Sequence, residues 1–302
     1  MEIGVIGVGV MGRNHVRVFS ELKSVDTLHV FDLNTAAAQE IGKRHGAVVA
    51  SSIDDLLSNV DAASVCVPTP FHAKVVSQVF AAKKSVLIEK PICATSAEAV
   101  NLMKSAPSGI TVGVGHIERF NPIVEEIHKI VKKPLYVEMK RHNPASARVT
   151  GSTVVEDLMI HDIDILISTF FEEPCNIRSA GNADLCSVLM QCENVPIALS
   201  ASRKSSKKIR LIYIEEEEFT IEGDFMSQEV TIYRKPGQYH IEDERYVQEN
   251  IIEKVMVNKL EPLKRELSTF VDCVKNRRPF PITAEQAIRN LKICEEIRAG
   301  LS

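Results

Sequence analysis

The sequence lacks the features that mark membrane, secreted and nucleic-acid-binding proteins. It has no apolar run of about 18 residues, the length that spans a bilayer, so we expect no membrane partner. The apolar N-terminal stretch has no basic segment before it and is interrupted by glycines, which argues against a signal peptide. The net charge is only -4 and acids and bases are interleaved, so no nucleic-acid partner is predicted.

Signals for cysteine pairing are also missing. The seven cysteines are an odd number, and no two of them form a Cys-x-x-Cys pair. Disulfide frameworks and zinc clusters need paired or closely spaced cysteines, so we predict no metal site of this kind. Reduced thiols fit better, and they indicate a cytoplasmic location.

The first third of the chain alternates short apolar runs with helix-forming segments. The runs cover residues 3–6, 28–31, 63–67, 85–88 and 110–114. Strands that alternate with helices form parallel sheets, and runs that are apolar throughout fit strands covered on both faces. The pattern therefore predicts an α/β domain.

The rhythm changes after about residue 120 and becomes rich in β-strand signals. Predicted strands cover residues 135–141, 177–183, 187–192, 196–202, 209–215 and 229–234, and predicted helices cover 122–131, 157–170, 262–275 and 284–299. Few helices separate these strands, which predicts a mostly antiparallel sheet. We expect domains at residues 1–118 and 119–302, with the C-terminal helices packing back on the first domain. An open sheet would expose an apolar face, so a homo-oligomer is expected.

A glycine fingerprint follows the first predicted strand. Gly7, Gly9 and Gly12 match Gly-x-Gly-x-x-Gly, with Val10 and Met11 between the last two, and a predicted helix begins at Arg13. Such glycines allow a tight turn, the approach of a pyrophosphate and close packing of helix on strand. The helix N-terminus then attracts the phosphates. We predict a Rossmann domain that binds a dinucleotide.

Asp32 ends the second predicted strand, twenty residues beyond Gly12. This is the usual interval for the acid that binds a ribose 2′-hydroxyl, and such an acid repels a 2′-phosphate. The spacing therefore favours NAD over NADP. The alternative is that Asp32 only caps the next helix.

Two further groups of residues are candidates for catalysis. Lys90, within Glu89-Lys90-Pro91, directly follows an apolar run, and ligands of open α/β sheets bind beyond such strand ends. Asp157 and His161 would share one face of a helix, where a carboxylate can orient an imidazole. The alternatives are an ordinary surface lysine, a surface histidine on a capped helix, and a metal site that includes Asp164.

These pieces together resemble the Gfo/Idh/MocA oxidoreductases, which act mainly on sugars and cyclitols. The resemblance extends over nearly the whole chain and rests on the fingerprint, on Glu89-Lys90-Pro91, on residues 69–72 and 115–122, and on the Asp157–His161 spacing. It implies a Rossmann domain followed by an α/β domain with a large open, mostly antiparallel sheet.

The resemblance also implies roles for single residues. Lys90 matches a lysine that contacts the substrate hydroxyl and the nicotinamide ribose, and Asp157 with His161 matches the catalytic pair. Further matches are cofactor-lining positions (Thr69, Pro70, His72 and Glu89) and positions near the nicotinamide (Arg119 and Asn121).

Within the family, residues 115–122 and 160–164 are most similar to the UDP-N-acetylglucosamine 3-dehydrogenase group. The expected activity is hydride transfer between a sugar hydroxyl and NAD. Alternatives are a dehydrogenase of a free sugar, an inositol or a UDP-sugar acid, and a non-catalytic NAD(P) sensor of the same fold.

Overall fold

The computed structural model describes residues 1–145, 151–172, 174–235, 240–242, 245–247 and 250–301. The chain forms two compact units, each built from two segments of the sequence. The first comprises residues 1–120 and 261–292, and the second comprises residues 121–260 and 293–302.

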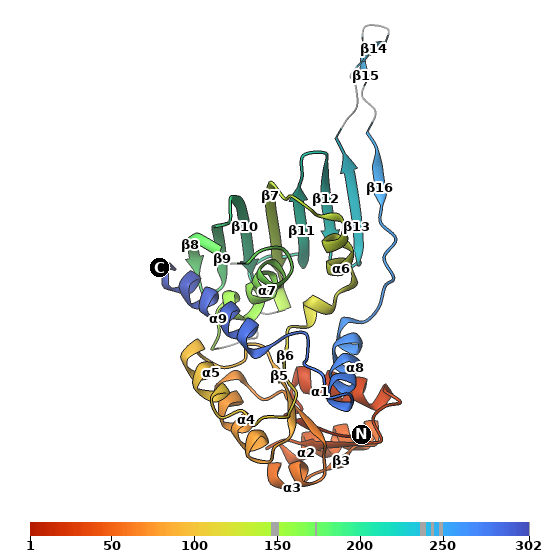
Figure 1. The fold of residues 1–302 in the computed structure, drawn as a ribbon, viewed down its shortest axis with the longest axis vertical. Coiled ribbons are helices and arrows are strands. Elements are labelled where there is room, and N and C mark those ends of the chain that lie inside the picture. The colour runs from red at the N-terminus through yellow and green to blue at the C-terminus, as the bar shows by residue number, and fades with distance from the viewer. Residues whose placement is uncertain (146–150, 173, 236–239, 243–244, 248–249, 302) are drawn as a thin grey trace. The chain divides into compact units, whose positions relative to one another are not determined.

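The first unit is organised around a six-stranded parallel sheet (Figure 1). Its strands are β1 (Glu2–Ile6), β2 (Thr27–Phe31), β3 (Val48–Val49), β4 (Ala62–Val65), β5 (Ser85–Glu89) and β6 (Val112–Gly115). Every residue of β4 and β5 is buried, so the centre of the sheet is covered on both faces. The order β3-β2-β1-β4-β5-β6 is that of the Rossmann fold, which confirms the predicted fold class.

Helices connect these strands. They are α1 (Val10–Glu21), α2 (Thr35–His45), α3 (Ile53–Ser58), α4 (His72–Ala81) and α5 (Ser96–Met103), with 3-10 turns η1 (Thr69–Phe71) and η2 (Ile117–Phe120). The strand order reverses between β1 and β4, so the loops after these two strands border the crevice where such folds bind ligands.

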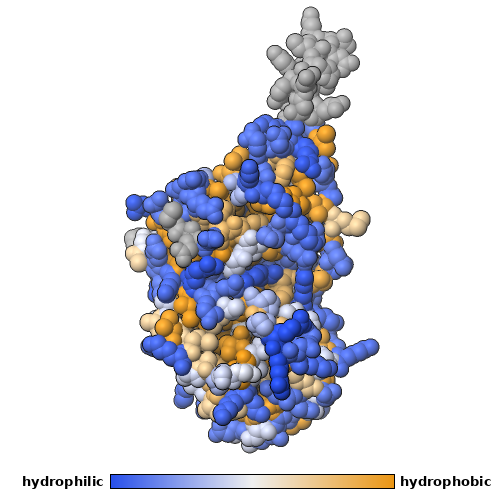
Figure 2. Space-filling model, viewed as in Figure 1, coloured by the Kyte–Doolittle hydropathy of each residue, from blue (hydrophilic) through white to orange (hydrophobic). Residues whose placement is uncertain are grey.

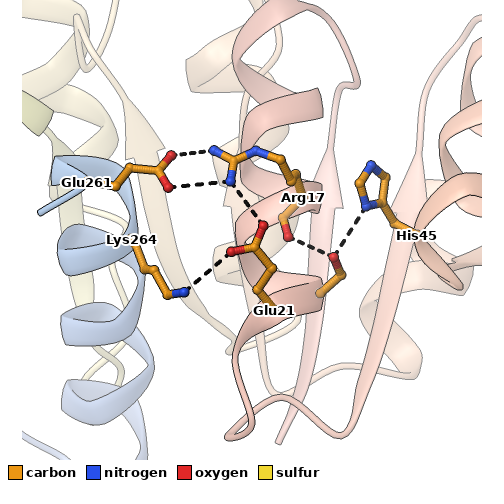
Figure 3. A network of polar contacts seen from close by, with 6 residues as sticks. Arg17, Glu21, His45, Glu261 and Lys264 are labelled. Atoms are coloured by element: carbon orange, nitrogen blue, oxygen red, sulfur yellow. Dashed lines mark hydrogen bonds and ion pairs between the residues drawn. The ribbon is translucent and has the colours of Figure 1, made fainter.

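A later segment of the chain completes the first unit. Helix α8 (Pro262–Lys275) packs against α1 and η2, and Phe270 contacts Phe280 in the core. At the surface, Arg17 of α1 forms ion pairs with Glu21 and Glu261, and Lys264 of α8 pairs with Glu21 (Figure 3). The last helix, α9 (Ala284–Ala299), begins in this unit.

The second unit contains an eight-stranded sheet of order β16-β13-β12-β11-β7-β10-β9-β8. Its strands are β7 (Tyr136–His142), β8 (Pro174–Asn182), β9 (Leu185–Cys192), β10 (Val195–Ser202), β11 (Ile209–Glu215), β12 (Phe219–Asp224), β13 (Glu229–Arg234) and β16 (Ile252–Lys254), and β14 (His240–Glu242) pairs with β15 (Arg245–Val247) in a separate sheet. Among the described strands of this sheet, β7 and β10 pair in parallel and the other neighbours pair antiparallel, which confirms a mostly antiparallel sheet.

Helices cover one face of this sheet. Helix α6 (Pro122–Ile130) packs on β12 and β13, and a second helical segment packs on β7 and β10. That segment consists of the π-helical turn η4 (Val155–Met159), helix α7 (Ile160–Ile165) and the π-helical turn η5 (Leu166–Phe170). The predicted single helix over residues 157–170 is therefore longer and irregular, with a wide turn at each end.

The surface is mixed in character. Figure 2 shows hydrophilic side chains around smaller hydrophobic areas on the visible face. In the part of the chain that the structure describes, no helix combines the length and apolar character needed to cross a bilayer.

Candidate functional site

The glycine loop of the first unit cannot accept side chains at two of its three glycines. Gly7 has a φ of +93°, and a Cβ there would lie 2.9 Å from the Cys66 carbonyl group. A Cβ on Gly12 would lie 1.9 Å from the Gly7 carbonyl oxygen. By contrast, a Cβ on Gly9 would meet nothing within 4 Å, which leaves this side of the loop accessible to a ligand.

The N-terminus of α1 has the properties of an anion site. Asn34, Ser52 and Thr95 cap α2, α3 and α5 with their side chains, whereas no side chain caps α1 at Gly9. Val10 is exposed and Met11 is half-buried in the first turn. The free N–H groups and the open side of Gly9 fit the pyrophosphate of a dinucleotide.

Asp32 fastens the glycine loop to the end of β2. Its Oδ2 accepts the Val8 N–H at 2.7 Å and its Oδ1 accepts the Asn34 N–H at 2.7 Å. The cap of α2 is Asn34, whose side chain accepts the Ala37 N–H at 3.1 Å. Helix capping is therefore not the role of Asp32, and each of its oxygens keeps a second lone pair for a hydroxyl donor.

The residues predicted around the ends of β4 and β5 divide into two sets. Thr69 and Lys90 are half-buried and Pro70 is exposed, so all three reach the surface of the first unit. His72 and Glu89 are instead buried and hydrogen-bonded to other residues of the first unit. The predicted lining role thus rests on positions whose side chains differ in accessibility.

Two buried imidazoles hold these strand ends. Nε2 of His15 lies 2.8 Å from Oε1 of Glu89, and Nδ1 lies 2.8 Å from the Ser64 hydroxyl. His72 is hydrogen-bonded to the carbonyl oxygens of Val67 at 2.8 Å and Pro91 at 2.9 Å. His15 was not predicted as a site residue. Its position on the apolar face of the predicted helix after the glycine fingerprint could have indicated a buried histidine near the strand ends.

Arg119 and Asn121 lie in different units and serve structural contacts. Nη1 of Arg119 donates to Oε1 of Gln286 at 2.8 Å in the first unit. The Asn121 side chain, 3% exposed, caps α6 and donates to the Phe225 carbonyl at 3.0 Å in the second. Both groups of the Asn121 amide are therefore engaged within its own unit.

The helical segment of the second unit presents two side chains away from the core. From Val154 to Ile167 every residue is buried except Asp157 and His161. This pattern supports the predicted shared face. Asp164 is fully buried, and among the described residues these three side chains do not form a group with the spacing of a metal site.

A buried ion pair anchors this segment to the sheet. Arg141 of β7 donates from Nε to Oδ1 of Asp162 at 2.8 Å, and both side chains are almost fully buried. The guanidinium also lies 5.3 Å from the centre of the Phe225 ring. At the start of the segment, Glu156 forms an ion pair of 2.9 Å with Arg298 of α9. These contacts fix the turns that carry Asp157 and His161.

Comparisons with known proteins agree with this architecture. Residues 1–116 match the family model described as "Oxidoreductase family, NAD-binding Rossmann fold", named GFO_IDH_MocA. A UDP-N-acetylglucosamine 3-dehydrogenase from Acidithiobacillus ferrooxidans is 30% identical over 100% of this chain and 97% of its own length. The chain belongs to the Gfo/Idh/MocA family. It is therefore an oxidoreductase that binds NAD(P) through its Rossmann unit.

A further relative matches a smaller part of the chain, and two solved structures share its fold. An inositol 2-dehydrogenase from Rhodococcus erythropolis is 30% identical over 59% of this chain and 55% of its own length. The crystal structure of the Acidithiobacillus ferrooxidans enzyme has a TM-score of 0.88 at 27% identity and covers 100% of this chain and 97% of that chain. A levoglucosan dehydrogenase in complex with NADH and levoglucosan has a TM-score of 0.83 at 15% identity, which shows the shared fold.

Proposed function

We propose that this chain is an NAD-dependent sugar dehydrogenase that acts on UDP-N-acetylglucosamine at C3. The support for this substrate is the full-length similarity to the enzyme of that name. Relatives named inositol 2-dehydrogenases match a smaller part of the chain, so inositols and free sugars are the nearest alternatives. A UDP-sugar acid and a non-catalytic NAD(P)-sensing role are the remaining ones.

The observation that supports a catalytic role is that Asp157 and His161 are partly exposed, whereas the other residues of 154–167 are buried. A carboxylate and an imidazole on otherwise buried turns are held where a ligand can reach them, which a sensor would not need. Lys90, at the end of β5 in the other unit, supplies a cation beside the expected position of the cofactor.

The residues of the first unit fit a dinucleotide. In this proposal the pyrophosphate is held by the loop and first turn of α1 (Gly7, Gly9, Val10, Met11 and Gly12), Asp32 accepts the ribose hydroxyls, and Thr69, Pro70 and Lys90 border the nicotinamide. The carboxylate of Asp32 would repel the 2′-phosphate of NADP, so NAD is the proposed cofactor. When bound, the nicotinamide supplies the hydride acceptor.

The protein groups then have separate tasks. His161 takes the proton of the sugar hydroxyl, and Asp157 orients the imidazole and stabilises its charged form. The Lys90 ammonium stabilises the negative charge that develops on the sugar oxygen. The second unit provides the substrate-binding surface in this scheme, and the first unit the cofactor-binding surface.

We also propose a cytoplasmic homo-oligomer. The face of the eight-stranded sheet opposite α6 and η4 exposes large apolar side chains, among them Leu189, Leu211 and Ile252. A second copy would cover these side chains. The six cysteines with described side chains are free thiols, as a reducing compartment requires.

Absorbance of NADH tests the activity with a panel of UDP-sugars, free sugars and inositols. We expect turnover with UDP-N-acetylglucosamine, and a loss of about 100- to 10,000-fold in kcat for His161→Asn and for Lys90→Met. The matched controls are His128→Asn and Lys74→Met, which change exposed residues of the same types and units. Full activity of Lys90→Met would disprove the mechanism, and turnover of inositols alone would disprove the substrate.

A further inference from the structure

Lys90 is flanked in the sequence by two residues that each bind a buried histidine. Its predecessor Glu89 binds His15 through the carboxylate, and its successor Pro91 binds His72 through the carbonyl oxygen. The two histidines come from different helices, α1 and α4. The residues before and after Lys90 are therefore hydrogen-bonded to two different helices.

The pair of His15 and Glu89 is ionic. Burial alone would lower the pKa of His15, but Cys66 and Glu89 raise it well above its usual range. Burial would raise the pKa of Glu89, yet the hydrogen bond from His15 and the charges of His15 and Lys90 lower it. An imidazolium donates from both ring nitrogens, so it satisfies Glu89 and Ser64 at the same time.

The charge of Glu89 also acts on Lys90. Because the Lys90 ammonium lowers the pKa of Glu89, the carboxylate must favour the charged form of Lys90 in return. Glu266 of α8 adds a second buried acid, since one of its carboxylate oxygens lies within 4.8 Å of a ring nitrogen of His15 and of a carboxylate oxygen of Glu89. Two buried acids, Glu89 and Glu266, therefore lie at this strand end together with His15, and Lys90 directly follows Glu89.

His72 makes a different kind of contact. Both of its ring nitrogens face carbonyl oxygens, which only accept hydrogen bonds, so the two bonds together need N–H groups on both nitrogens. Burial nevertheless lowers the pKa of His72, and the two carbonyls and the charge of Glu89 only partly oppose this shift, so a neutral ring donates to one of the two carbonyls at a time. The ring joins the end of β4 at Val67 to the turn after Lys90.

We propose that His15 and His72 are positioning residues for Lys90, His15 through the Glu89 carboxylate and His72 through the Pro91 carbonyl. The role of Lys90 that they serve is the one in the proposed function. His15 maintains the charge beside the lysine, and His72 maintains the path of its main chain.

The position of His15 links two parts of the first unit. It lies on α1, whose N-terminus fits the phosphates of the cofactor, and it binds the residue next to Lys90. Helix α1 thus carries the proposed phosphate site at its N-terminus and also holds Glu89, the residue before Lys90. Loss of His15 should therefore lower turnover more than it lowers cofactor affinity.

The experiment compares His15→Gln, Glu89→Gln and His72→Gln with His45→Gln in the full chain. His45, at the end of α2, is hydrogen-bonded to the Ser20 hydroxyl at 3.3 Å and is the matched control (Figure 3). The pKa of Lys90 is measured by competitive acetylation at several pH values with mass spectrometry of its peptide. This readout needs no substrate, so it remains valid if the proposed function fails.

We expect the midpoint of Lys90 acetylation to fall by about one pH unit in Glu89→Gln, because a neighbouring negative charge is lost. It should fall in His15→Gln as well, since a buried carboxylate without its partner takes up a proton. In His72→Gln the midpoint should stay constant. With a substrate that the wild type converts, kcat should fall about 10- to 100-fold in all three variants, as expected when the Lys90 ammonium is displaced.

The affinity for NADH is measured from its own fluorescence, without interference from protein indoles, since the chain has no tryptophan. It should change by less than about threefold, or 0.7 kcal/mol. Unaltered midpoints and kcat in folded His15→Gln and Glu89→Gln would overturn the proposal, as would a stoichiometric divalent metal bound by these side chains. If His15→Gln does not fold, Glu89→Gln, which keeps the side-chain size, decides.

Discussion

The candidate residues of the two units differ in kind. In the first unit the proposed cofactor-binding loop is main chain, shaped by Gly7 and Gly12, and buried histidines and acids that can titrate lie in the same unit. In the second unit the candidate residues are two side chains on a helical segment held by Arg141 and Asp162. Arginine does not lose its proton in proteins, so this anchor keeps its charge at any ordinary pH. The two units should therefore respond differently to small side-chain changes and to pH.

The largest effect should come from a methyl group in the glycine loop. Gly12→Ala would place a Cβ 1.9 Å from the Gly7 carbonyl oxygen, so the loop cannot form and NADH binding should be abolished. Gly9→Ala is the matched control for folding, because its Cβ meets no protein atom, and it should weaken NADH only about tenfold, or 1.4 kcal/mol. NADH fluorescence and urea unfolding measure the two effects. Equal affinities for the two variants would contradict a main-chain cradle.

Breaking the anchor of the second unit should have the next largest effect. Arg141→Met leaves Asp162 buried without this partner, and we expect a loss of about 3–5 kcal/mol in the free energy of unfolding. Urea unfolding followed by circular dichroism measures it, while NADH affinity at low urea should not change. The double variant Arg141→Met/Asp162→Leu should recover most of the stability. If Arg141→Met alone were as stable as the wild type, Arg141 would not anchor the helical segment.

The pH dependence of stability should distinguish the first unit from the second. The raised pKa of His15 stabilises the fold fully below about pH 6.5, and this contribution is lost as the pH rises through the folded-state value. The lowered pKa of Glu89 stabilises the fold above about pH 4.3, and this contribution is lost as the pH falls through the folded-state value. Both contributions are complete between about pH 4.3 and 6.5.

Glu89→Gln should therefore lower the free energy of unfolding most between about pH 4.3 and 6.5, by about 2 kcal/mol, and by less at pH 9. Urea midpoints at pH 5.5 and 9 give the difference, with Glu285→Gln, a change of an exposed acid in the same unit, as the control. A cost that does not vary with pH would show that the pair does not titrate as argued.

The smallest effect is expected at the surface of the first unit. Glu261→Gln breaks the ion pair between Arg17 and the residue before α8 (Figure 3). Exposed pairs contribute less than about 1 kcal/mol, and salt screens them, so the variant should match the wild type in unfolding at 0.5 M NaCl. A loss above about 2 kcal/mol would mean that surface charges, rather than the buried core, hold α8 in place.

The sequence was most informative where structure is local. The strands of the first unit are apolar runs because parallel strands are buried on both faces, and the fingerprint is visible because main-chain geometry requires glycine at Gly7 and Gly12. Short elements were not predicted. Strand β3 has two residues and helix α3 has six, too few to show a period.

Contacts between distant residues were not predictable. His15 and Glu89 are 74 residues apart, and Arg141 and Asp162 are 21 apart on different elements, so no spacing rule joins them. The same holds for the hydrogen bonds of Asp32 to Val8 and of His72 to Pro91. The family resemblance indicated Glu89 and His72 as cofactor-lining positions, but only the structure shows that both are buried and contact other protein residues.

The division of both units into two segments has a consequence for synthesis of the chain. The first unit needs Glu261–Lys292, which supplies Phe270, Phe280 and Glu266 to its interior, and the second needs Ile293–Ser302, which supplies Arg298 to Glu156. A nascent chain that has emerged only to Leu260 therefore holds two incomplete cores at once. The first unit can therefore reach its final set of contacts only after residues 261–292 have left the ribosome, and the second only after residues 293–302 have done so.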